Sequence, residues 1–325
     1  MADQGGHGGN RMTAERNRKS QARRQYRRGA ASLVGLGEDR LIGTLTRGWP
    51  RACGNLIAGV GDDCAVVRSA PANQLLLLKT DAVVEGVHFK SGAPPAKVGW
   101  KALARCLSDI AAMGGTPDAA LIALAAPPHT PLAKIRGIYR GLARCAEKFD
   151  VTLAGGETVR ADQLSLTVTA TGRVARQHLL LRSGARPGDV LCVTGRLGGS
   201  GAGHHLSFSP RLAEAQWLAA NARPTAMMDI SDGLAADLPR LCKASQVGAD
   251  LNLARIPIRN RSTLERALAE GEDFELLFAI PPARLLKIKR RWPFRTAVTE
   301  IGTITSRRGI RPAITSHGHD HFQKP

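Results

Sequence analysis

The sequence predicts an α+β protein built from two mixed domains of similar size. From about residue 35 to residue 175, apolar runs of strand length alternate with stretches whose apolar residues recur at helical spacing. A Gly- and Pro-rich segment, Arg182–Asp189, then leads into a second series of the same kind. A length of 325 residues is enough for two such domains, each with its own core. We therefore expect domains at residues 35–178 and 179–325.

The elements of the first domain follow from the period of the apolar residues. Spacings of three and four predict helices, and short apolar or strictly alternating runs predict strands. The helices are expected at Glu38–Leu45, Val98–Met113 and Leu132–Phe149, and the strands at Leu75–Thr80, Leu121–Ala126 and Leu164–Thr171.

The same criteria predict the elements of the second domain. A strand is expected directly after the Gly- and Pro-rich segment, and helices and further strands follow it. The strands are expected at Val190–Thr194, Phe274–Ile280 and Arg295–Ile304, and the helices at Leu212–Asn221 and Leu234–Ala244.

The net charge of +19 is unevenly distributed along the chain. Residues 1–30 hold eight Lys and Arg against Asp3 and Glu15, with almost nothing that could form a core. Such a composition is typical of disordered segments, so residues 1–34 are predicted to be a basic tail. We interpret it as a functionless extension, or as the result of a start codon upstream of a true start at Met12. The alternatives are weak binding of RNA or another polyanion by its cations and an Arg-rich transit peptide.

Composition and cysteine usage indicate a cytoplasmic globular protein that is not inserted in a membrane. The chain is 43% hydrophobic and 22% charged, and no apolar run approaches the ~20 residues that span a bilayer. The first thirty residues lack the apolar core of a secretory signal. The six cysteines are scattered without a CxxC pair, which argues against structural zinc and against a disulfide scaffold. We expect them to be small buried hydrophobic residues.

Acidic residues gather at the ends of apolar runs, usually beside glycine. Six short motifs share this arrangement: Gly61-Asp62-Asp63, Lys79-Thr80-Asp81, Ser108-Asp109, Gly155-Gly156-Glu157, Asp229-Ile230-Ser231-Asp232-Gly233 and Gly271-Glu272-Asp273. One such residue alone is usually a helix cap or a turn residue. Six of one kind indicate metal ligands, because a buried carboxylate must be paired or must hold a cation. Oxygen ligands favour Mg²⁺ over softer metals.

Asp109 illustrates the problem that a cation would solve. It lies inside the helix expected at Val98–Met113, three residues after Cys106, and therefore borders the apolar face. A carboxylate there destabilises the fold unless a cation or hydrogen-bond donors satisfy it.

Several Mg²⁺ ions held by carboxylates are what the phosphates of ATP require. The chain has no G-x-x-x-x-G-K-[ST] loop, no G-x-G-x-x-G fingerprint and no protein-kinase signature set. The glycines of residues 198–203 lack the phosphate-binding lysine. An ATP site in this chain would therefore follow a different plan.

These motifs, in this order, resemble those of the thiamine-monophosphate kinase family, whose superfamily includes aminoimidazole ribonucleotide synthetase. The matching segments are GVGDDCAVV (59–67), KTDAVVEGVHF (79–89), GWKALARCLSDIAAMGG (99–115), AGGETVR (154–160), LRSGARPGDVLCVTG (181–195), DISDGLAADL (229–238), GEDFELLF (271–278) and GHDHF (318–322). The resemblance implies the two-domain aminoimidazole ribonucleotide synthetase-like fold, with an N-terminal sheet domain that forms a barrel in a homodimer and a C-terminal α/β domain. It also implies a kinase that transfers the γ-phosphoryl group of ATP directly to thiamine monophosphate with the help of Mg²⁺, giving thiamine diphosphate.

The resemblance assigns roles to residues of this chain position by position. The metal site would consist of Asp63, Lys79, Thr80, Asp81, Asp109, Glu157, Asp229 and Asp232, with Lys79 contributing through its backbone. Asp81, Asp109, Glu157 and Asp232 are expected to be catalytic. ATP would contact Gly156, Glu157, Arg182 and Ser231, and the acceptor substrate would contact His88, Glu272 and His319.

Three of these positions depart from the family pattern. Glu157 replaces the usual Asp, Glu270 replaces a glycine, and His319 replaces an aromatic residue next to the substrate. Two alternatives stay open. The first is another ATP-using enzyme of the superfamily with a different acceptor. The second is a basic nucleic-acid-binding protein, which the net charge favours and the aromatic content of 4% does not.

Overall fold

The computed structural model describes residues 38–45, 55–59, 61–68, 73–314 and 318–320. The chain divides into two compact units, residues 1–47 with 320–325 and residues 48–319. In the first unit, helix α2 (Glu38–Leu45) has the bounds that the sequence predicts. The predicted basic tail, residues 1–34, lies outside the described residues.

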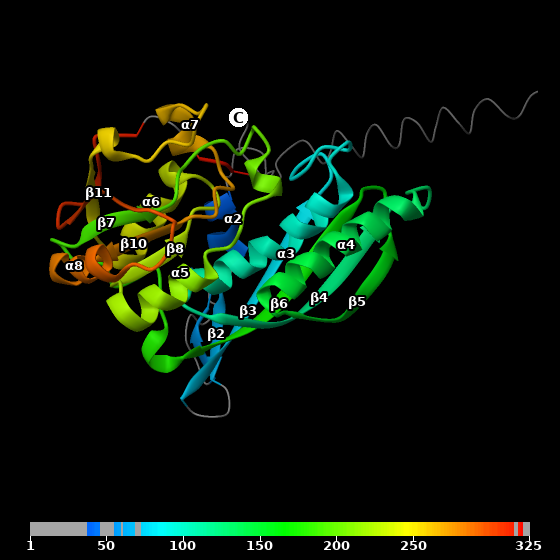
Figure 1. Cartoon of the computed structure of the whole chain (residues 1–325), viewed down its shortest axis with the longest axis horizontal. Helices are drawn as coiled ribbons and strands as arrows, with labels where there is room; N and C mark the ends of the chain where they lie inside the picture. The colour runs from blue at the N-terminus through cyan, green and yellow to red at the C-terminus, as the bar shows by residue number, and fades with distance from the viewer. Residues whose placement is uncertain (1–37, 46–54, 60, 69–72, 315–317, 321–325) are drawn as a thin grey trace, which may run out of the picture. The chain divides into compact units, whose positions relative to one another are not determined.

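The first half of the unit formed by residues 48–319 contains a six-stranded sheet covered on one face by two helices. Its order is β1-β2-β3-β6-β4-β5, and only the β4–β5 pair is parallel among the pairs described. The strands are β1 (Leu56–Ala58), β2 (Ala65–Arg68), β3 (Gln74–Val84), β4 (Thr116–Ala126), β5 (Thr152–Arg160) and β6 (Ser165–Ala175), and the helices are α3 (Pro95–Ala112) and α4 (Leu132–Phe149). Both helices lie along the same face of the sheet (Figure 1).

A second six-stranded sheet follows, in the order β12-β9-β11-β7-β10-β8. Its strands are β7 (Val190–Thr194), β8 (Ala226–Asp229), β9 (Gly248–Leu251), β10 (Leu276–Ile280), β11 (Val298–Thr305) and β12 (Gly309–Arg311), and its helices are α5 (Leu212–Trp217), α6 (Leu234–Ser245), α7 (Leu264–Ala269) and α8 (Pro282–Arg291). All five residues of β10 are buried. Leu277 packs in the core with α6 and α7, whereas Phe278 packs in the core with α8, so helices cover both faces.

Helix α3 is the element that positions most of the polar residues discussed below. Thirteen of its 18 residues are buried. The reason is that one hydrophobic cluster runs from the first sheet through α3 to α5 and β10 of the second sheet. Because α3 is enclosed in this way, its polar side chains lie between the two sheets.

The sequence predicts several elements to the residue, including α4 and β7. The helix expected at Leu212–Asn221 ends as an α-helix at Trp217 and continues as a π-helical segment, Leu218–Ala222. The strand expected from Phe274 begins only at Leu276, because Phe274 has a φ of 52° and cannot extend a strand. In the sequence, the last strand of the first sheet ends at Ala175 and the first strand of the second sheet begins at Val190. The exact domain bounds at residues 178 and 179 stay a prediction.

Two expectations from composition concern the described residues only. Their five cysteines, Cys64, Cys106, Cys145, Cys192 and Cys242, are free thiols and buried, as predicted. None of the helices in the described ranges has the length and apolar character needed to cross a membrane.

Candidate functional site

Three carboxylates from distant segments meet in the region between the two sheets. Asp63 lies in the loop between β1 and β2, Asp109 lies on α3, and Asp229 ends β8. One oxygen of each lies within 4.8 Å of the others. The exposed fractions of the three residues are only 3%, 7% and 1%. Three buried carboxylates so close together repel one another strongly, so the arrangement requires positive charge.

Two basic side chains provide part of that charge. The guanidinium of Arg182 donates from Nη2 to Asp63 Oδ1 at 2.8 Å and from Nε to Asp63 Oδ2 at 3.2 Å. This bidentate geometry is the strongest that a carboxylate and an arginine can form. Lys79 on β3 places its Nζ 2.9 Å from Asp109 Oδ1. Asp63 and Asp109 are thus each paired.

Asp229 has no cationic partner among the described side chains. Its Oδ2 accepts a hydrogen bond of 2.6 Å from the hydroxyl of Ser108. Its Oδ1 is buried and has no hydrogen-bond partner within the part of the chain that the structure describes. A buried carboxylate oxygen left open beside two other carboxylates is the feature expected of a cation ligand.

The electrostatics of the cluster agree with this view. Burial, followed by the charge of Asp63, raises the pKa of Asp229 to about 7. Burial also raises the pKa of Asp109 well above its usual value, although Lys79 opposes the rise. The protein alone therefore does not stabilise all of the negative charge that it gathers at this point.

Asp81 extends the cluster along β3. Its carboxylate lies 3.9 Å from Lys79 Nζ and 3.6 Å from Arg105 Nη2, which comes from α3. Burial disfavours the charged form of Lys79, but Asp109 and Asp81 outweigh burial and raise its pKa well above the usual value. Lys79 therefore stays protonated between two carboxylates that the sequence assigned to the metal site.

The loop between β8 and α6 holds Ser231 and Asp232 beside this cluster. The carboxylate Oδ2 of Asp237, on the first turn of α6, accepts hydrogen bonds from the backbone N–H groups of Ser231 at 3.0 Å and Asp232 at 2.9 Å. Arg240 pairs with both Asp232 and Asp237. The loop is therefore fixed by side chains of α6, which follows it in the sequence.

The residues expected to contact the acceptor substrate are connected to the same loop. The backbone N–H of Glu272 donates to Ser231 O at 2.6 Å, and that of His319 donates to Asp232 O at 2.9 Å. A Cβ on Gly271 would lie 2.7 Å from Ser231 O, so only glycine permits this close approach. His88 is linked to Glu272 through Lys101, whose Nζ contacts His88 O and the Glu272 carboxylate.

Thr80 and Glu157 lie apart from the three carboxylates. Thr80 alternates with Lys79 and Asp81 along β3, so its side chain lies on the opposite face, where its hydroxyl is 3.1 Å from that of Thr169. Glu157 lies on the edge strand β5, is exposed, and accepts from the backbone N–H of Thr158. The residue before Glu157 must be a glycine, because a Cβ at position 156 would lie 1.8 Å from Ile122 O.

Several residues of this site had no role assigned to them from the sequence. Lys101 and Ser108 on α3 are buried with Asp109, Arg105 on the same helix is half-buried, and Asp237 is fully buried. A usable signal existed for Lys101, because it follows Val98 by three residues and precedes Asp109 by eight, which corresponds to the apolar face of the helix. The signal for Asp237 was its position four residues after Gly233, in the first turn of a helix.

Both halves of the chain resemble those of known proteins. The AIR synthase related proteins match with their N-terminal domain at residues 61–174 and with their C-terminal domain at residues 186–314. The thiamine-monophosphate kinase of Rhodopirellula baltica is 37% identical over 282 residues, which cover 81% of this chain and 88% of that protein. The enzyme of the same name from Synechococcus elongatus is 38% identical over 299 residues, covering 81% of this chain and 91% of its own.

Solved structures give the same result. AaThiL complexed with AMPPCP and TMP superimposes with a TM-score of 0.78 at 31% identity, covering 88% of this chain and 97% of that one. The thiamine-monophosphate kinase of Stenotrophomonas maltophilia superimposes with a TM-score of 0.69 at 30% identity, covering 86% and 96% of the two chains. With this identity over most of its length, the chain belongs to the thiamine-monophosphate kinase family of AIR synthase related proteins.

Proposed function

We propose that the protein transfers the γ-phosphoryl group of ATP to thiamine monophosphate, with thiamine diphosphate and ADP as products. The observation that carries the proposal is the buried group of Asp63, Asp109 and Asp229, together with the open oxygen of Asp229. Enzymes that act on nucleotide phosphates commonly bind their metal ions through clustered carboxylates. The names of the relatives support ATP and thiamine monophosphate as the two substrates.

The donor set fits Mg²⁺. All three clustered ligands are carboxylates, with no His or Cys among them, and hard oxygen ligands are those that Mg²⁺ prefers. In our proposal Asp63, Asp109 and Asp229 hold the metal, with Asp81 and Asp232 close by. When bound, Mg²⁺ neutralises the phosphate oxygens over which negative charge spreads during the transfer.

The protein's own task in this reaction is to hold the two substrates in line. An oxygen of the acceptor's phosphate forms the new bond to the γ-phosphorus, the bond from that phosphorus to the β–γ bridging oxygen breaks, and ADP leaves with the electron pair. In the proposal Arg182, Ser231, Gly156 and Glu157 orient ATP. His88, Glu272 and His319 bind the acceptor, and an ionised Glu272 complements the positive thiazolium ring of thiamine monophosphate.

We also propose that the active form is a homodimer. The face of the first sheet opposite α3 and α4 carries Leu78, Leu121 and Val159, which are 38%, 50% and 51% exposed among the described residues. Thr80 and Glu157 occupy the same face, because they pair with residues of the neighbouring strands on that side. Burial of this face against a second copy would cover its apolar residues. A Leu121→Glu variant is expected to be monomeric in light scattering, and an unchanged dimer would contradict the proposed face.

We assign the enzyme to the cytoplasm, because it would consume ATP there and its five described cysteines are buried free thiols. The test of the function is product analysis with a set of acceptors. Purified protein with ATP and Mg²⁺ is expected to convert thiamine monophosphate to thiamine diphosphate and to leave thiamine, which lacks the accepting phosphate, unchanged. ATP turnover with another phosphorylated acceptor instead would identify a different member of the superfamily. Binding of RNA without any turnover would favour a nucleic-acid-binding protein.

A further inference from the structure

Lys101 on α3 is a lysine enclosed at the junction of three distant segments. Its exposed fraction is 0%. Its Nζ donates to His88 O at 2.5 Å, lies 2.7 Å from His205 Nδ1, and lies 2.6 and 2.8 Å from the two carboxylate oxygens of Glu272. An ammonium has three N–H donors. His88 O and the two carboxylate oxygens of Glu272 accept all three, and His205 Nδ1 can then donate to Glu272.

The pairing keeps the carboxylate of Glu272 ionised. Burial alone would raise the pKa of Glu272, but the hydrogen bond from His205 and the charge of Lys101 lower it to about 2. Burial lowers the pKa of Lys101 to about 8, against the opposing effect of Glu272. The ion pair is therefore intact near neutral pH, with a full negative charge on Glu272.

The backbone fixes the same carboxylate from the other side. Glu272 has a φ of 65°, which a residue with a side chain rarely adopts, and its N–H is bonded to Ser231 O at 2.6 Å. Its carboxylate lies 3.1 Å from His205 Nδ1, a residue of the short helix His204–Leu206. Two independent restraints, one on the backbone and one on the carboxylate, leave this side chain a single position.

We propose that Lys101 is a positioning residue for the phosphoryl acceptor, which it serves by fixing the carboxylate of Glu272 in the acceptor pocket. The inference rests on the proposed function, in which Glu272 binds the acceptor. A lysine that only filled space would have no reason to direct its N–H groups at His88 O and the Glu272 carboxylate, because burying an ammonium is costly and an apolar side chain packs without that cost.

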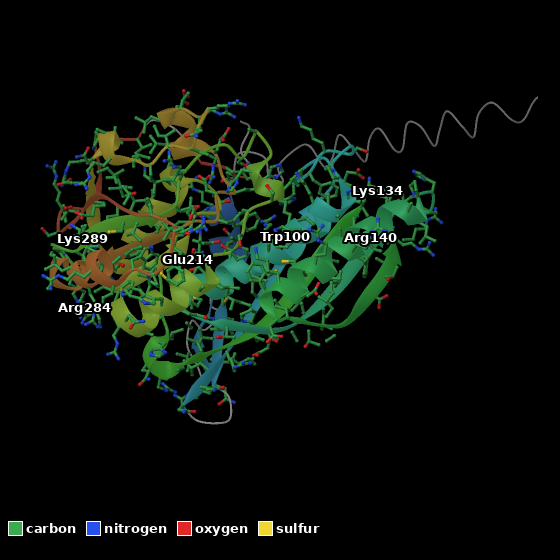
Figure 2. The ribbon with its side chains drawn as sticks, in the orientation of Figure 1. Trp100, Lys134, Arg140, Glu214, Arg284 and Lys289 are labelled. Carbon is green, nitrogen blue, oxygen red and sulfur yellow. The ribbon has the colours of Figure 1, made fainter. Side chains whose placement is uncertain are left out.

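The role predicts a specific effect on one substrate. Lys101→Met removes the charge but keeps an unbranched side chain of similar length. We expect the Kd for thiamine monophosphate, measured by titration calorimetry, to rise at least tenfold, while the Kd for a non-hydrolysable ATP analogue changes less than twofold. Lys289→Met is the matched control. Lys289 lies on α8 (Figure 2), is paired with Glu300 at 2.5 Å and is 57% exposed, so its loss should change neither constant.

A double-mutant comparison separates positioning from packing. If Lys101 acts through Glu272, then Glu272→Gln and the double variant Lys101→Met/Glu272→Gln bind thiamine monophosphate with the same Kd. The double variant contains no unpaired buried charge, so the comparison holds even if Lys101→Met alone is too unstable to purify. Additive losses in the double variant, or equal weakening of both substrates, would overturn the inference.

The wild-type titration distinguishes this inference from the function on which it rests. Wild-type protein that binds the ATP analogue but not thiamine monophosphate would contradict the proposed acceptor and the positioning role together. Wild-type protein that binds both, with Lys101→Met binding thiamine monophosphate equally well, would contradict the positioning role alone.

Discussion

The hydroxyl of Ser108 donates to Asp229 Oδ2 at 2.6 Å and joins residues 121 positions apart in the sequence. The bond connects α3 to the end of β8 and satisfies one of the two oxygens of Asp229. The other oxygen, Oδ1, is buried without a partner among the described residues. This half-satisfied carboxylate is the observation on which the proposed Mg²⁺ site rests.

Mg²⁺ is expected to stabilise the protein more at pH 8 than at pH 5.5. In the metal-free protein the pKa of Asp229 is about 7, against about 4 in an unfolded chain. Between pH 4 and pH 7 the folded protein therefore keeps a proton on Asp229 that the unfolded chain has lost. The stability from this proton is present below pH 4 and is lost as the pH rises to 7. A metal that binds the ionised carboxylate competes with the proton. At a hundred times its Kd it should add about 2.7 kcal/mol, or roughly 5–10 °C in Tm.

Thermal melts with and without Mg²⁺ at the two pH values check this expectation. Asp229→Asn should remove most of the Mg²⁺ effect, whereas Asp250→Asn, which alters an exposed ion pair with Arg311, should leave it intact. A Mg²⁺ effect of the same size in Asp229→Asn and wild type would show that the metal binds elsewhere.

Arg182 is expected to stabilise the fold only as the partner of Asp63. Arg182→Met leaves a carboxylate with a fully buried side chain without its cation, which should cost about 3–5 kcal/mol in urea unfolding without Mg²⁺. Added Mg²⁺ should recover part of the loss because it replaces the missing charge. Arg311→Met breaks an exposed pair and should cost less than about 1 kcal/mol. Equal costs for the two variants would mean that the Arg182–Asp63 pair contributes no more than a surface contact.

His319→Tyr is expected to lower the KM for thiamine monophosphate by about 2- to 10-fold. The backbone of His319 is held by its bond to Asp232 O, and a larger aromatic ring at that position stacks better on a substrate ring, by about 0.5–1.5 kcal/mol. The KM for ATP should hardly change. His129→Tyr, in an exposed turn, serves as the control. An unchanged KM in His319→Tyr would indicate that this side chain does not face the acceptor.

We propose that residues 1–34 bind polyanions through charge alone. Substitution of the eight Lys and Arg of residues 1–30 by Gln keeps the length of the segment and should weaken salt-sensitive RNA binding without changing kcat. The slope of log K against log salt should become shallower in proportion to the number of phosphates that these cations neutralise in the wild type. RNA affinity that is independent of these residues would assign the binding to another part of the chain.

The sequence singled out the three clustered carboxylates because their signals are local, whereas their role as metal ligands stays a prediction. Asp63, Asp109 and Asp229 each follow an apolar run or interrupt an apolar helix face, and a buried acid can be recognised from that context alone. The periodicity that predicted α4 to the residue is local in the same sense. Strand β5 was not predicted, because its residues are almost all exposed and show no apolar pattern.

The remaining features depend on tertiary interactions that no local pattern contains. The place of Lys101 on the apolar face of its helix can be recognised in the sequence, but its partner Glu272, 171 positions away, cannot. The separation of Thr80 from Lys79 and Asp81 follows from the alternation of β3, but the sequence does not say which face of the sheet meets the three clustered carboxylates. Helix α3 packs on one face of the first sheet, and this packing determines which face of β3 lies next to Asp109.

The central claim is tested most directly by the formation of thiamine diphosphate in a matched pair of proteins. Wild type and Asp109→Asn are incubated with ATP, Mg²⁺ and thiamine monophosphate, and thiamine diphosphate and ADP are quantified together. We expect equal amounts of the two products with wild type. In Asp109→Asn we expect a rate lower by on the order of a hundredfold, because one carboxylate of the proposed metal site is lost while the fold, checked by its Tm, remains. Wild-type protein that forms no thiamine diphosphate, or a folded Asp109→Asn that forms it at the wild-type rate, would contradict the account.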